Sequence, residues 1–371
     1  MIMRILISAW SFYPSQEGGP SNAIYWLASG LARAGHSVRV VTTNRCQREG
    51  DVVTNTWNRL NDFDVIYETL DSRGPIIKEE IGKCDVYITN GVCRLENYRL
   101  TRMALRLGKK VILSPRGELL NSAVNHKGKA YGLLKKMFFQ IMKCSYGKKV
   151  LYHATSPEEV DSIKKYMGED ARIKLIPNYM ILPEKINAKM AVEPYLLYVG
   201  RLNHIKNIDI VISGLAKSVT FMKNSLKFKI AGERKGEYYE SLVAQVQSSG
   251  LSDKVEFLGL VTGKEKYKLY AGAKCLILMS KSENFGNVIV EALSQGTPVI
   301  ASKGTPWQQL NEKGAGWWID ADSEHVAETV NNLLSLDNER YTQMREASFA
   351  LSREYDIFTN IGKWVEVIEH P

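Results

Sequence analysis

Ser280–Lys303 reads SKSENFGNVIVEALSQGTPVIASK, and its order of loop, helix and strand decides the fold. An apolar run, Cys275–Met279, comes directly before it and has the length of a short buried strand. The polar, glycine-containing loop Ser280–Gly286 then opens a helical pattern, and Val299–Ala301 is the next apolar run. Short strands that alternate with helices are typical of a parallel sheet with helices on both faces.

Two glutamates stand within this stretch. Seven residues separate Glu283 from Glu291, so Glu283 falls on the loop and Glu291 about one turn inside the helix, and both can face one crevice. The unpaired amides at the helix start suit a phosphate group; they belong to Phe285, Gly286, Asn287 and Val288. An ionised carboxylate accepts hydrogen bonds from two sugar hydroxyls at once. The stretch therefore predicts a ligand that carries both phosphate and hydroxyl groups.

Glu283, Glu291 and the surrounding residues FGNVIVEALSQGTPVIAS resemble the signature of retaining glycosyltransferases of family 4. A surface helix with two solvated acids is the alternative, and the following Gly296-Thr297-Pro298 turn and strand favour the resemblance. The family has the GT-B fold, an α/β fold with two Rossmann-like domains that face a central cleft. The resemblance implies transfer of a hexosyl-type sugar from a UDP- or GDP-linked donor to a hydroxyl, with retained anomeric configuration and no obligatory metal. Glu291 would hold the ribose and Glu283 the transferred sugar.

The loop after the apolar run Tyr195–Val199 carries a second motif, GRLNHIKN. Its Gly200 allows close backbone approach, and a guanidinium at Arg201 with an ammonium at Lys206 suits a diphosphate. On its own this loop would be a solvated basic turn. The resemblance implies that Arg201 and Lys206 neutralise the leaving diphosphate.

Three further residues are assigned to donor binding. Gly18 and Gly19 lie between a first apolar run, Ile5–Ala9, and an amphipathic helical pattern, Ser21–Ala34. The resemblance places these glycines near the transferred sugar and the phosphates, whereas two glycines alone would indicate a plain turn. Leu258, at the end of another apolar run, stands where relatives hold the nucleotide base.

A Pro-Arg-Gly motif closes another strand of the first half, within Ser114–Leu119. Many family members have Pro-His-Gly there, so this sequence resembles a subgroup with Arg116 in place of the histidine. Arginine cannot act as a base at neutral pH, and Arg116 is therefore expected to position or stabilise charge. Glu118 is a candidate acceptor contact. At Tyr179 the sequence has tyrosine where relatives have the glycine of a Pro-Asn-Gly turn, which would be strained if φ were positive.

Length and composition predict a two-domain globular protein. The chain has 371 residues, of which 44% are hydrophobic and 24% charged. We expect an N-terminal, acceptor-binding Rossmann-like domain at 1–180, a linker at 181–194 and a nucleotide-sugar-binding domain at 195–354. The segment 355–371 would be a C-terminal helix that crosses back to the first domain.

The sequence favours a cytoplasmic protein, and the expected place of a peripheral one is the cytoplasmic face of the membrane. Five scattered cysteines without a C-x-x-C pair indicate reduced thiols, and no apolar run has the length of a membrane span. No dinucleotide fingerprint is present, and the histidines lack metal-ligand spacing, so no cofactor or metal is expected. The D-x-D match at Asp62-Phe63-Asp64 is interpreted as chance, because it lies far from the phosphate motifs.

The basic excess lies in the first half. Residues 1–180 contain 27 Lys and Arg against 17 Asp and Glu, whereas residues 181–371 contain 22 against 23. Within 127–149 lysines, among them Lys135 and Lys136, surround an apolar helical pattern, and no acid occurs from Leu119 to Pro157. Such a helix can lie on an anionic membrane, and a core helix with a basic solvent side is the alternative. Nucleic acid is not expected, because no nucleic-acid module accompanies the patch.

These features favour a lipid-linked glycan as acceptor, in the assembly of bacterial lipopolysaccharide O-antigen, capsule or exopolysaccharide. Two other hypotheses remain open. A nucleotide-sugar epimerase or hydrolase can have the same fold, since fold alone does not define activity. A catalytically silent glycan-binding or membrane-binding protein is the third, against which the intact set of charged motif residues argues.

Overall fold

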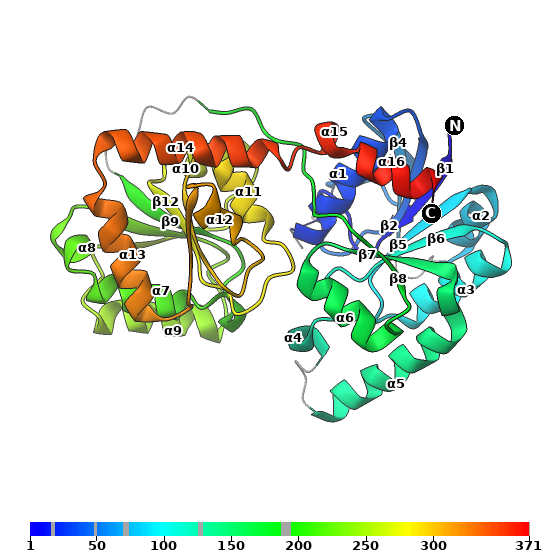
Figure 1. The fold of residues 1–371 in the computed structure, drawn as a ribbon, viewed down its shortest axis with the longest axis horizontal. Coiled ribbons are helices and arrows are strands. Elements are labelled where there is room, and N and C mark those ends of the chain that lie inside the picture. The colour runs from blue at the N-terminus through cyan, green and yellow to red at the C-terminus, as the bar shows by residue number, and fades with distance from the viewer. Residues whose placement is uncertain (16–18, 48–49, 70–73, 125–128, 187–193, 371) are drawn as a thin grey trace. The chain divides into compact units, whose positions relative to one another are not determined.

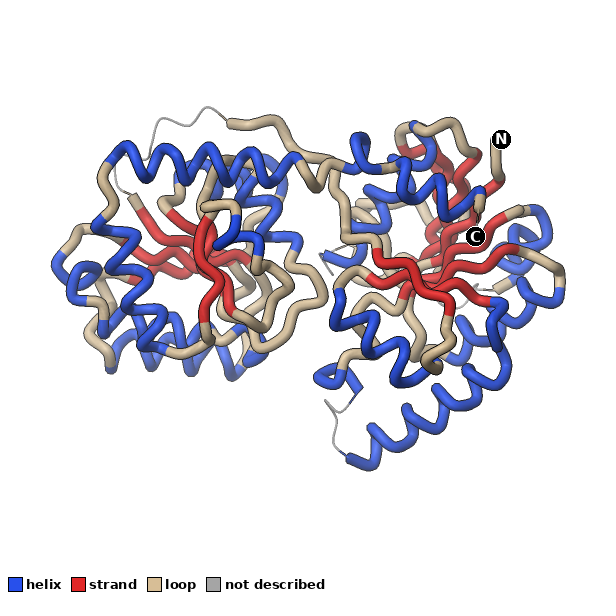
Figure 2. Tube along the Cα trace, viewed as in Figure 1, coloured by secondary structure: helices blue, strands red, loops and turns tan. Residues whose placement is uncertain are grey.

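The computed structural model describes residues 1–15, 19–47, 50–69, 74–124, 129–186 and 194–370. Two compact units divide the chain: unit 1 is Met1–Ile181 with Asp356–Pro371, and unit 2 is Leu182–Tyr355. Each unit contains one twisted sheet covered by helices, and Figure 2 shows the strands of each sheet as the inner layer. The chain thus leaves unit 1 once and returns to it at its C-terminal end.

Unit 1 is built on an eight-stranded sheet with the order β3-β4-β2-β1-β5-β6-β7-β8. All neighbouring strands are parallel except β3 and β4. The strands are β1 (Arg4–Ser8), β2 (Ser37–Thr43), β3 (Trp57–Leu60), β4 (Phe63–Glu68), β5 (Val86–Asn90), β6 (Lys110–Ser114), β7 (Val150–Ala154) and β8 (Arg172–Leu175). The helices are α1 (Gly19–Arg33), α2 (Pro75–Lys83), α3 (Leu95–Arg106), α4 (Asn121–Val124), α5 (Lys129–Tyr146), α6 (Pro157–Met167), α15 (Ile357–Asn360) and α16 (Gly362–Glu369), with a short 3₁₀ turn, Gly147–Lys149.

Unit 2 is built on a six-stranded, wholly parallel sheet with the order β11-β10-β9-β12-β13-β14. Its strands are β9 (Tyr195–Val199), β10 (Lys227–Ala231), β11 (Val255–Gly259), β12 (Cys275–Leu278), β13 (Val299–Ser302) and β14 (Gly316–Ile319). Its helices are α7 (Ile208–Lys217), α8 (Val219–Lys223), α9 (Glu237–Ser248), α10 (Gly263–Gly272), α11 (Asn287–Leu293), α12 (Gln309–Glu312), α13 (Ser323–Ser335) and α14 (Asn338–Arg353), with a 3₁₀ turn, His204–Lys206. Figure 1 shows these helices on both sides of the sheet.

The predicted fold of two Rossmann-like α/β domains is confirmed. The central strands β1, β5, β9 and β12 are almost completely buried, because helices cover both faces of a parallel sheet. Strand order reverses between β1 and β5 in unit 1, and between β9 and β12 in unit 2. Ligands of such sheets bind beyond the carboxyl ends of the strands at this point. The loops after β9 and β12 are those with the predicted motifs of unit 2.

The sequence patterns missed the two edge strands of unit 1 and one helix break. The edge strands β3 and β8 are partly exposed and lack a continuous apolar run, so they did not read as strands. The helix expected over Tyr355–Ile368 is two helices, α15 and α16, and the carboxylate of Asp356 caps the first by accepting from the Phe358 amide (3.2 Å). Among the described residues, no helix is long and apolar enough to cross a bilayer.

Candidate active site

The loop between β12 and α11 holds Glu283 at the switch point of unit 2. The Glu283 amide donates to the carbonyl of Gly304 (2.8 Å), and the Ser280 hydroxyl donates to the Glu283 carboxylate (2.9 Å). Gly286 ends the loop with φ 88°, a conformation that favours glycine, and caps the helix start. The loop is therefore fixed from both sides, and the carboxylate of Glu283 has a defined position.

The second predicted loop comes from β9 and meets the first. The Lys206 ammonium contacts Oε1 of Glu283, and the two side chains are only 18% and 16% exposed. A backbone hydrogen bond from the Lys281 amide to the Ile205 carbonyl (2.7 Å) joins the two loops. The structure thus brings together two residues 77 positions apart in the sequence. A largely buried ion pair that keeps some exposure to solvent can exchange its internal contact for a ligand's charges and hydroxyls.

Arg201 lies on the same loop and is exposed. Its carbonyl accepts a hydrogen bond from the Tyr198 hydroxyl (2.9 Å), which fixes the backbone but leaves the side chain outside the core. Within the described part of the chain, no acceptor is found within hydrogen-bonding distance of the guanidinium. A Cβ at Gly200 would lie 2.9 Å from the Tyr198 hydroxyl, so the backbone does approach closely there. Burial raises the pKa of Tyr198, with the Glu283 charge adding, and keeps this phenol neutral.

Glu291 is more deeply buried than the sequence suggests. It lies on α11, is 3% exposed, and both carboxylate oxygens have partners on α10. Lys266 donates to one oxygen (2.8 Å) and the hydroxyl of Tyr270 donates to the other (2.9 Å). A ribose at this carboxylate would have to share these oxygens with Lys266 and Tyr270. Burial raises the pKa of Tyr270, and the Glu291 charge raises it further.

The remaining donor-binding candidates of unit 2 differ in burial. The Phe285 ring is buried against Trp307 (centroids 5.3 Å apart) and Tyr355 (5.5 Å), so only its backbone can face a ligand. Asn287 and Val288 form the first turn of α11, which has seven residues. Leu258 lies on the edge strand β11 and is partly exposed.

In unit 1, Gly19 begins α1, and Gly18 lies outside the described residues. Arg116 follows β6 with φ 55°, and its guanidinium donates to the side-chain oxygens of Asn90 (2.9 Å) and Asn178 (2.8 Å). Burial lowers the pKa of Arg116 to about 10, so it stays charged at neutral pH. These hydrogen bonds tie the ends of β5 and β6 to the segment that follows β8. The strain considered at Tyr179 does not arise, because its φ is not positive.

Glu118, the candidate acceptor contact, is already used inside unit 1. One carboxylate oxygen accepts from the amides of Val92 (2.5 Å) and Cys93 (2.8 Å), which fixes the loop after β5. Glu159 is fully buried and fixes the Pro-Arg-Gly loop in the same way. It accepts from the Gly117 amide (2.6 Å) and from the amide (2.8 Å) and hydroxyl (2.9 Å) of Thr155. A substrate hydroxyl at Glu118 would compete with two backbone amides.

His153 is buried on β7 as a neutral imidazole. Nε2 donates to the Ile176 carbonyl (2.8 Å), and Nδ1 accepts from the Ser114 hydroxyl (2.7 Å), which sets the tautomer. Burial lowers the pKa of His153 to about 3, and the nearby Arg116 charge lowers it further. Because the folded pKa is depressed, the unfolded chain binds the extra proton first as pH falls. This residue thus stabilises the fold above about pH 6.5, and its contribution decreases at lower pH.

We expect the wild-type protein to lose about 2 kcal/mol of unfolding free energy through His153 between about pH 7 and about pH 5. Urea unfolding at a series of pH values measures this loss, and His153→Gln is the matched variant because it has no titrating ring. Carboxylates that titrate in the same range affect both proteins equally. Parallel pH profiles for the wild type and the variant would contradict the assignment.

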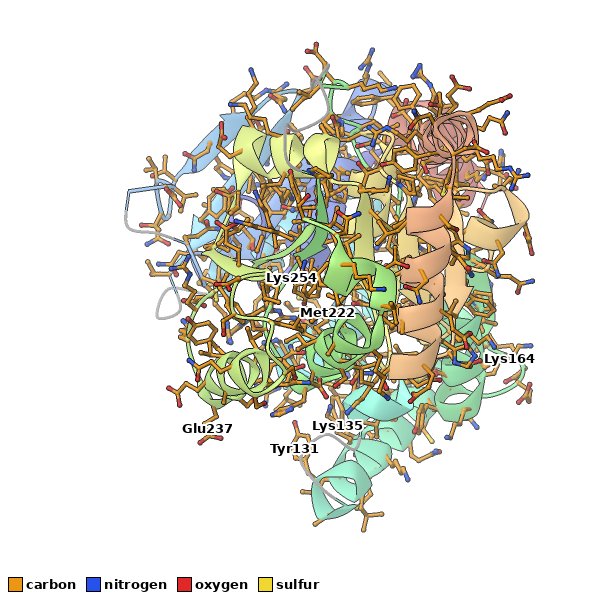
Figure 3. The ribbon with its side chains drawn as sticks, turned by 90° about the vertical axis from the view of Figure 1, so that its left-hand side faces the viewer. Tyr131, Lys135, Lys164, Met222, Glu237 and Lys254 are labelled. Atoms are coloured by element: carbon orange, nitrogen blue, oxygen red, sulfur yellow. The ribbon has the colours of Figure 1, made fainter. Side chains whose placement is uncertain are left out.

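The two predicted lysines of α5 differ. The Lys135 ammonium donates to the Ala123 carbonyl (2.9 Å) and lies 5.2 Å from the Tyr131 ring centroid, so it joins α5 to α4. Figure 3 labels Tyr131 and Lys135 near the start of this helix. Lys136 is exposed. Of this pair, Lys136 is the one that points away from the fold.

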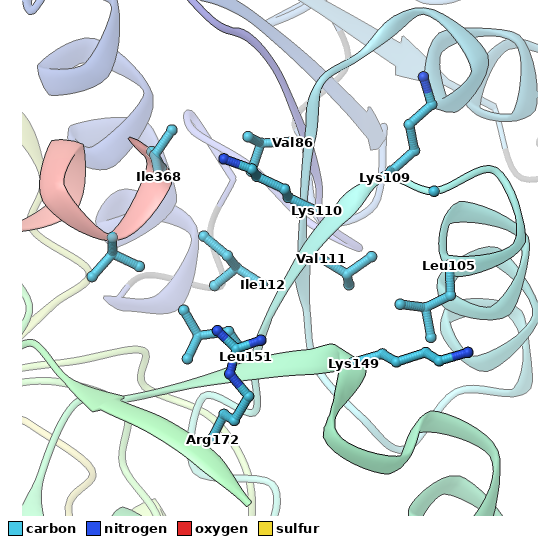
Figure 4. Close-up of a pocket in the computed structure, with 12 residues that line it drawn as sticks. Val86, Leu105, Lys109, Lys110, Val111, Ile112, Lys149, Leu151, Arg172 and Ile368 are labelled. Atoms are coloured by element: carbon cyan, nitrogen blue, oxygen red, sulfur yellow. The ribbon is translucent and has the colours of Figure 1, made fainter. Parts of the chain in front are cut away.

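A cavity of about 310 Å³ opens at the amino ends of β5, β6, β7 and β8 (Figure 4). Four cationic residues and an apolar floor line it, and two of the cations, Lys109 and Lys110, donate to the carbonyls of Gly82 (2.8 Å) and Glu369 (3.3 Å). Arg116 follows the carboxyl end of β6, so it lies at the opposite ends of these strands. The cavity is therefore separate from the candidate site.

Sequence patterns missed the residues that hold the glutamates. Lys266, Tyr270 and Ser280 contact the two motif glutamates, and Glu159 fixes the Pro-Arg-Gly loop. Lys266 and Tyr270 lie four apart on α10, a spacing that places them on one helix face, but nothing in the sequence relates that face to Glu291. Among the described residues, no group of three or more His, Cys, Asp or Glu side chains could hold a metal ion.

The matching family model lies in unit 2, whereas similar proteins align with most of the chain. Residues 184–350, most of unit 2, match the family model described as Glycosyl transferases group 1. An uncharacterized glycosyltransferase of Methanocaldococcus jannaschii is 26% identical over 361 residues, covering 90% of this chain and 89% of that protein. The GDP-mannose:cellobiosyl-diphosphopolyprenol alpha-mannosyltransferase of Xanthomonas oryzae pv. oryzae is 25% identical over an alignment of 390 residues, covering 98% and 96%. These matches support the family resemblance drawn from the motifs.

Among solved structures, Anabaena HepE in complex with UDP and glucose is similar to the whole chain, with a TM-score of 0.74. The alignment covers 100% of each chain at 17% identity. At this identity the likeness concerns the fold, two Rossmann-like α/β domains as in GT-B glycosyltransferases.

Proposed function

We propose that this chain is a retaining glycosyltransferase that moves a hexosyl-type sugar from a UDP- or GDP-linked donor to a hydroxyl of a glycan acceptor. The observation that carries the proposal is the contact between Lys206 and Glu283 at the switch point of unit 2, with exposed Arg201 on the same loop. An ammonium paired with a carboxylate, and an exposed guanidinium on the same loop, stand where parallel sheets bind ligands. The match of 184–350 to the glycosyltransferase family model supports the same activity.

The chemistry requires charge more than covalent catalysis. A nucleoside diphosphate leaves the sugar carbon while an oxocarbenium-like sugar forms, so negative charge grows on the diphosphate. The Arg201 guanidinium can bind two of its oxygens, and the Lys206 ammonium adds a point charge. Glu283 accepts a hydrogen bond from a hydroxyl of the transferred sugar. A donor phosphate oxygen takes the acceptor proton on the same face of the sugar, so the anomeric configuration is retained. This step requires no histidine at position 116.

The ribose binds at Glu291 in this proposal, beside Lys266 and Tyr270. No metal is needed to neutralise the diphosphate, because the two basic residues of the β9 loop supply the charge. Transfer that continues undiminished in EDTA is the expected result. Loss of transfer in EDTA and its recovery with Mg²⁺ or Mn²⁺ would replace this part of the proposal with metal-assisted transfer.

The acceptor is proposed to be a lipid-linked glycan at the cytoplasmic face of a membrane. The similar Xanthomonas protein acts, by its name, on a cellobiosyl-diphosphopolyprenol, which is a lipid-linked acceptor. The net charge of +9 supports an anionic partner of this type. Assembly of bacterial lipopolysaccharide O-antigen, capsule or exopolysaccharide would use such a step.

A thermal-shift panel tests the donor class. We expect one nucleoside diphosphate among UDP, GDP and ADP, with its sugars, to raise the melting temperature by about 5–10 °C at a hundredfold excess over its Kd, without added metal. CMP is the control, because it lacks the second phosphate. No shift with any nucleotide at millimolar concentration would contradict the proposed activity.

Product analysis separates the alternative enzyme. An epimerase or hydrolase of the same fold would convert the donor without an acceptor, whereas a transferase needs the acceptor hydroxyl. NMR of the product then gives the anomeric configuration relative to the donor. Inverted configuration would contradict the retaining mechanism, and free sugar as the main product would favour hydrolysis.

A further inference from the structure

Helix α5 has two apolar faces, and unit 1 covers only one of them. Phe139, Met142 and Tyr146 are at most 1% exposed and belong to the core of unit 1. The opposite face carries four large apolar side chains that are open to solvent: Leu133 (61%), Leu134 (64%), Met137 (58%) and Ile141 (52%). A helix that only closes the core would place polar residues there.

The four residues form a continuous stripe, named here the α5 stripe. Leu133, Met137 and Ile141 follow one another at intervals of four, and Leu134 lies beside them one turn before Met137, so all share one side of the helix. Figure 1 shows α5 at the outer edge of unit 1, where α3, α4 and α6 pack against its other sides. Scattered exposed apolar residues are normal, but a contiguous row of four marks an interaction surface.

Cations flank the α5 stripe on both sides. Lys136 and Lys143 lie on α5 itself and are exposed, and the helix contains no acidic residue. On the α3 side, the guanidinium of Arg102 donates to the Tyr98 hydroxyl (3.3 Å), which lies 2.9 Å from the Ser145 hydroxyl of α5. The hydrogen bond with Ser145 lowers the pKa of Tyr98, and the charges of Arg102 and Arg106 lower it further. Asp170, whose carboxylate is near Lys143, is paired with Lys148 (3.2 Å).

We propose that the α5 stripe is a docking surface for an anionic lipid bilayer, with the helix lying in the membrane interface. Its four apolar side chains would enter the boundary between headgroups and acyl chains, and the flanking cations would meet acidic headgroups. Charge favours this partner over a second copy of the chain. A two-fold contact through the same face would bring lysines and arginines of one copy next to those of the other.

Only the biological role of this docking surface rests on the proposed function, because a lipid-linked acceptor is held at such a membrane. Docking through α5 fixes unit 1 at the headgroups, where the diphosphate and first sugars of such an acceptor lie. The physical claim about α5 can be tested without any sugar donor.

Vesicle sedimentation of the full chain is the test. We expect binding to phosphatidylcholine vesicles that contain phosphatidylglycerol, and little binding to phosphatidylcholine alone. Leu134→Gln with Ile141→Gln should lower the partition coefficient by more than about tenfold, because two apolar anchors are lost. Lys136→Gln with Lys143→Gln should lower it by about fivefold for each charge, and only on the anionic vesicles.

Matched controls come from unit 2. Val219 is 60% exposed and Lys223 is exposed, both on α8, so Val219→Gln and Lys223→Gln remove the same kinds of group elsewhere. These variants should sediment like the wild type. All variants change exposed side chains, so their melting temperatures and their shifts with nucleotide should match the wild type.

Three outcomes would overturn the proposal. Wild-type protein that does not sediment with anionic vesicles is the first, and α5 variants that sediment as well as the wild type are the second. The third is a dimer on size-exclusion chromatography that the apolar α5 variant abolishes, without vesicle binding, because the stripe would then bind a second copy. The nucleotide panel remains a separate measurement, so vesicle binding without any nucleotide shift contradicts the transferase proposal and leaves the docking surface intact.

Discussion

Arg201→Ala lowers kcat/KM for sugar transfer by about 10²–10³-fold while the free energy of unfolding stays that of the wild type. The expectation follows from the position of the side chain. Arg201 is exposed on the β9 loop, and only its carbonyl is used within unit 2, so its removal leaves no buried partner without a charge. The variant loses stabilisation of the transition state, in which the negative charge on the diphosphate is largest.

Lys206→Ala is the informative companion. It should lower kcat/KM by a similar factor, and it should also lower the free energy of unfolding by about 2 kcal/mol, because Glu283 is left largely buried without its cation. Steady-state kinetics and urea unfolding measured on both variants check the contrast, and Lys223→Ala serves as the control for loss of a lysine. Equal losses of stability in Arg201→Ala and Lys206→Ala would show that the distinction between them is wrong. Unchanged sugar transfer in both variants would show that this loop does not bind the diphosphate.

The sequence predicted the layers of the fold because buried parallel strands are continuous apolar runs. Tyr195–Val199 and Cys275–Leu278 are of this kind, and both strands lie where the pattern placed them. β8 has the residues RIKL and is mostly exposed at a sheet edge, where no apolar run is required. The edge strands of unit 1 were therefore missed for the same reason that the central strands were found.

At the candidate site, motif residues could be named from sequence but their partners could not. Glu283 and Lys206 stand on loops of adjacent strands, and strand adjacency of β9 and β12 comes from the sheet order. The partners of Glu291 come from a helix 21 and 25 residues away, which has no motif of its own. Arg116 was predicted to position or stabilise charge and Glu118 to contact the acceptor, and the structure gives both of them hydrogen-bond partners within unit 1.

Replacement of Glu291 should have the second large effect, and it separates a ribose contact from a purely structural role. Glu291→Ala leaves the Lys266 ammonium and the Tyr270 hydroxyl without an acceptor inside unit 2, and should cost about 3–5 kcal/mol of unfolding free energy. The isosteric Glu291→Gln keeps an acceptor for Tyr270 and should be milder. Both should weaken binding of the nucleoside diphosphate and reduce the thermal shift that it causes.

Lys266→Met is the matched control, because it breaks the same ion pair and keeps the Glu291 carboxylate. If the carboxylate binds the ribose, Lys266→Met destabilises unit 2 but retains the nucleotide shift. Wild-type protein should then bind the 2′,3′-dideoxy nucleotide about tenfold or more weakly than the parent, since buried polar groups lose their partners, and Glu291→Gln should not distinguish the two. Equal affinity of the wild type for both nucleotides would contradict the ribose contact. In that case Glu291 serves only to join α10 to α11, and the loss of nucleotide binding in its variants reflects the displaced helix start.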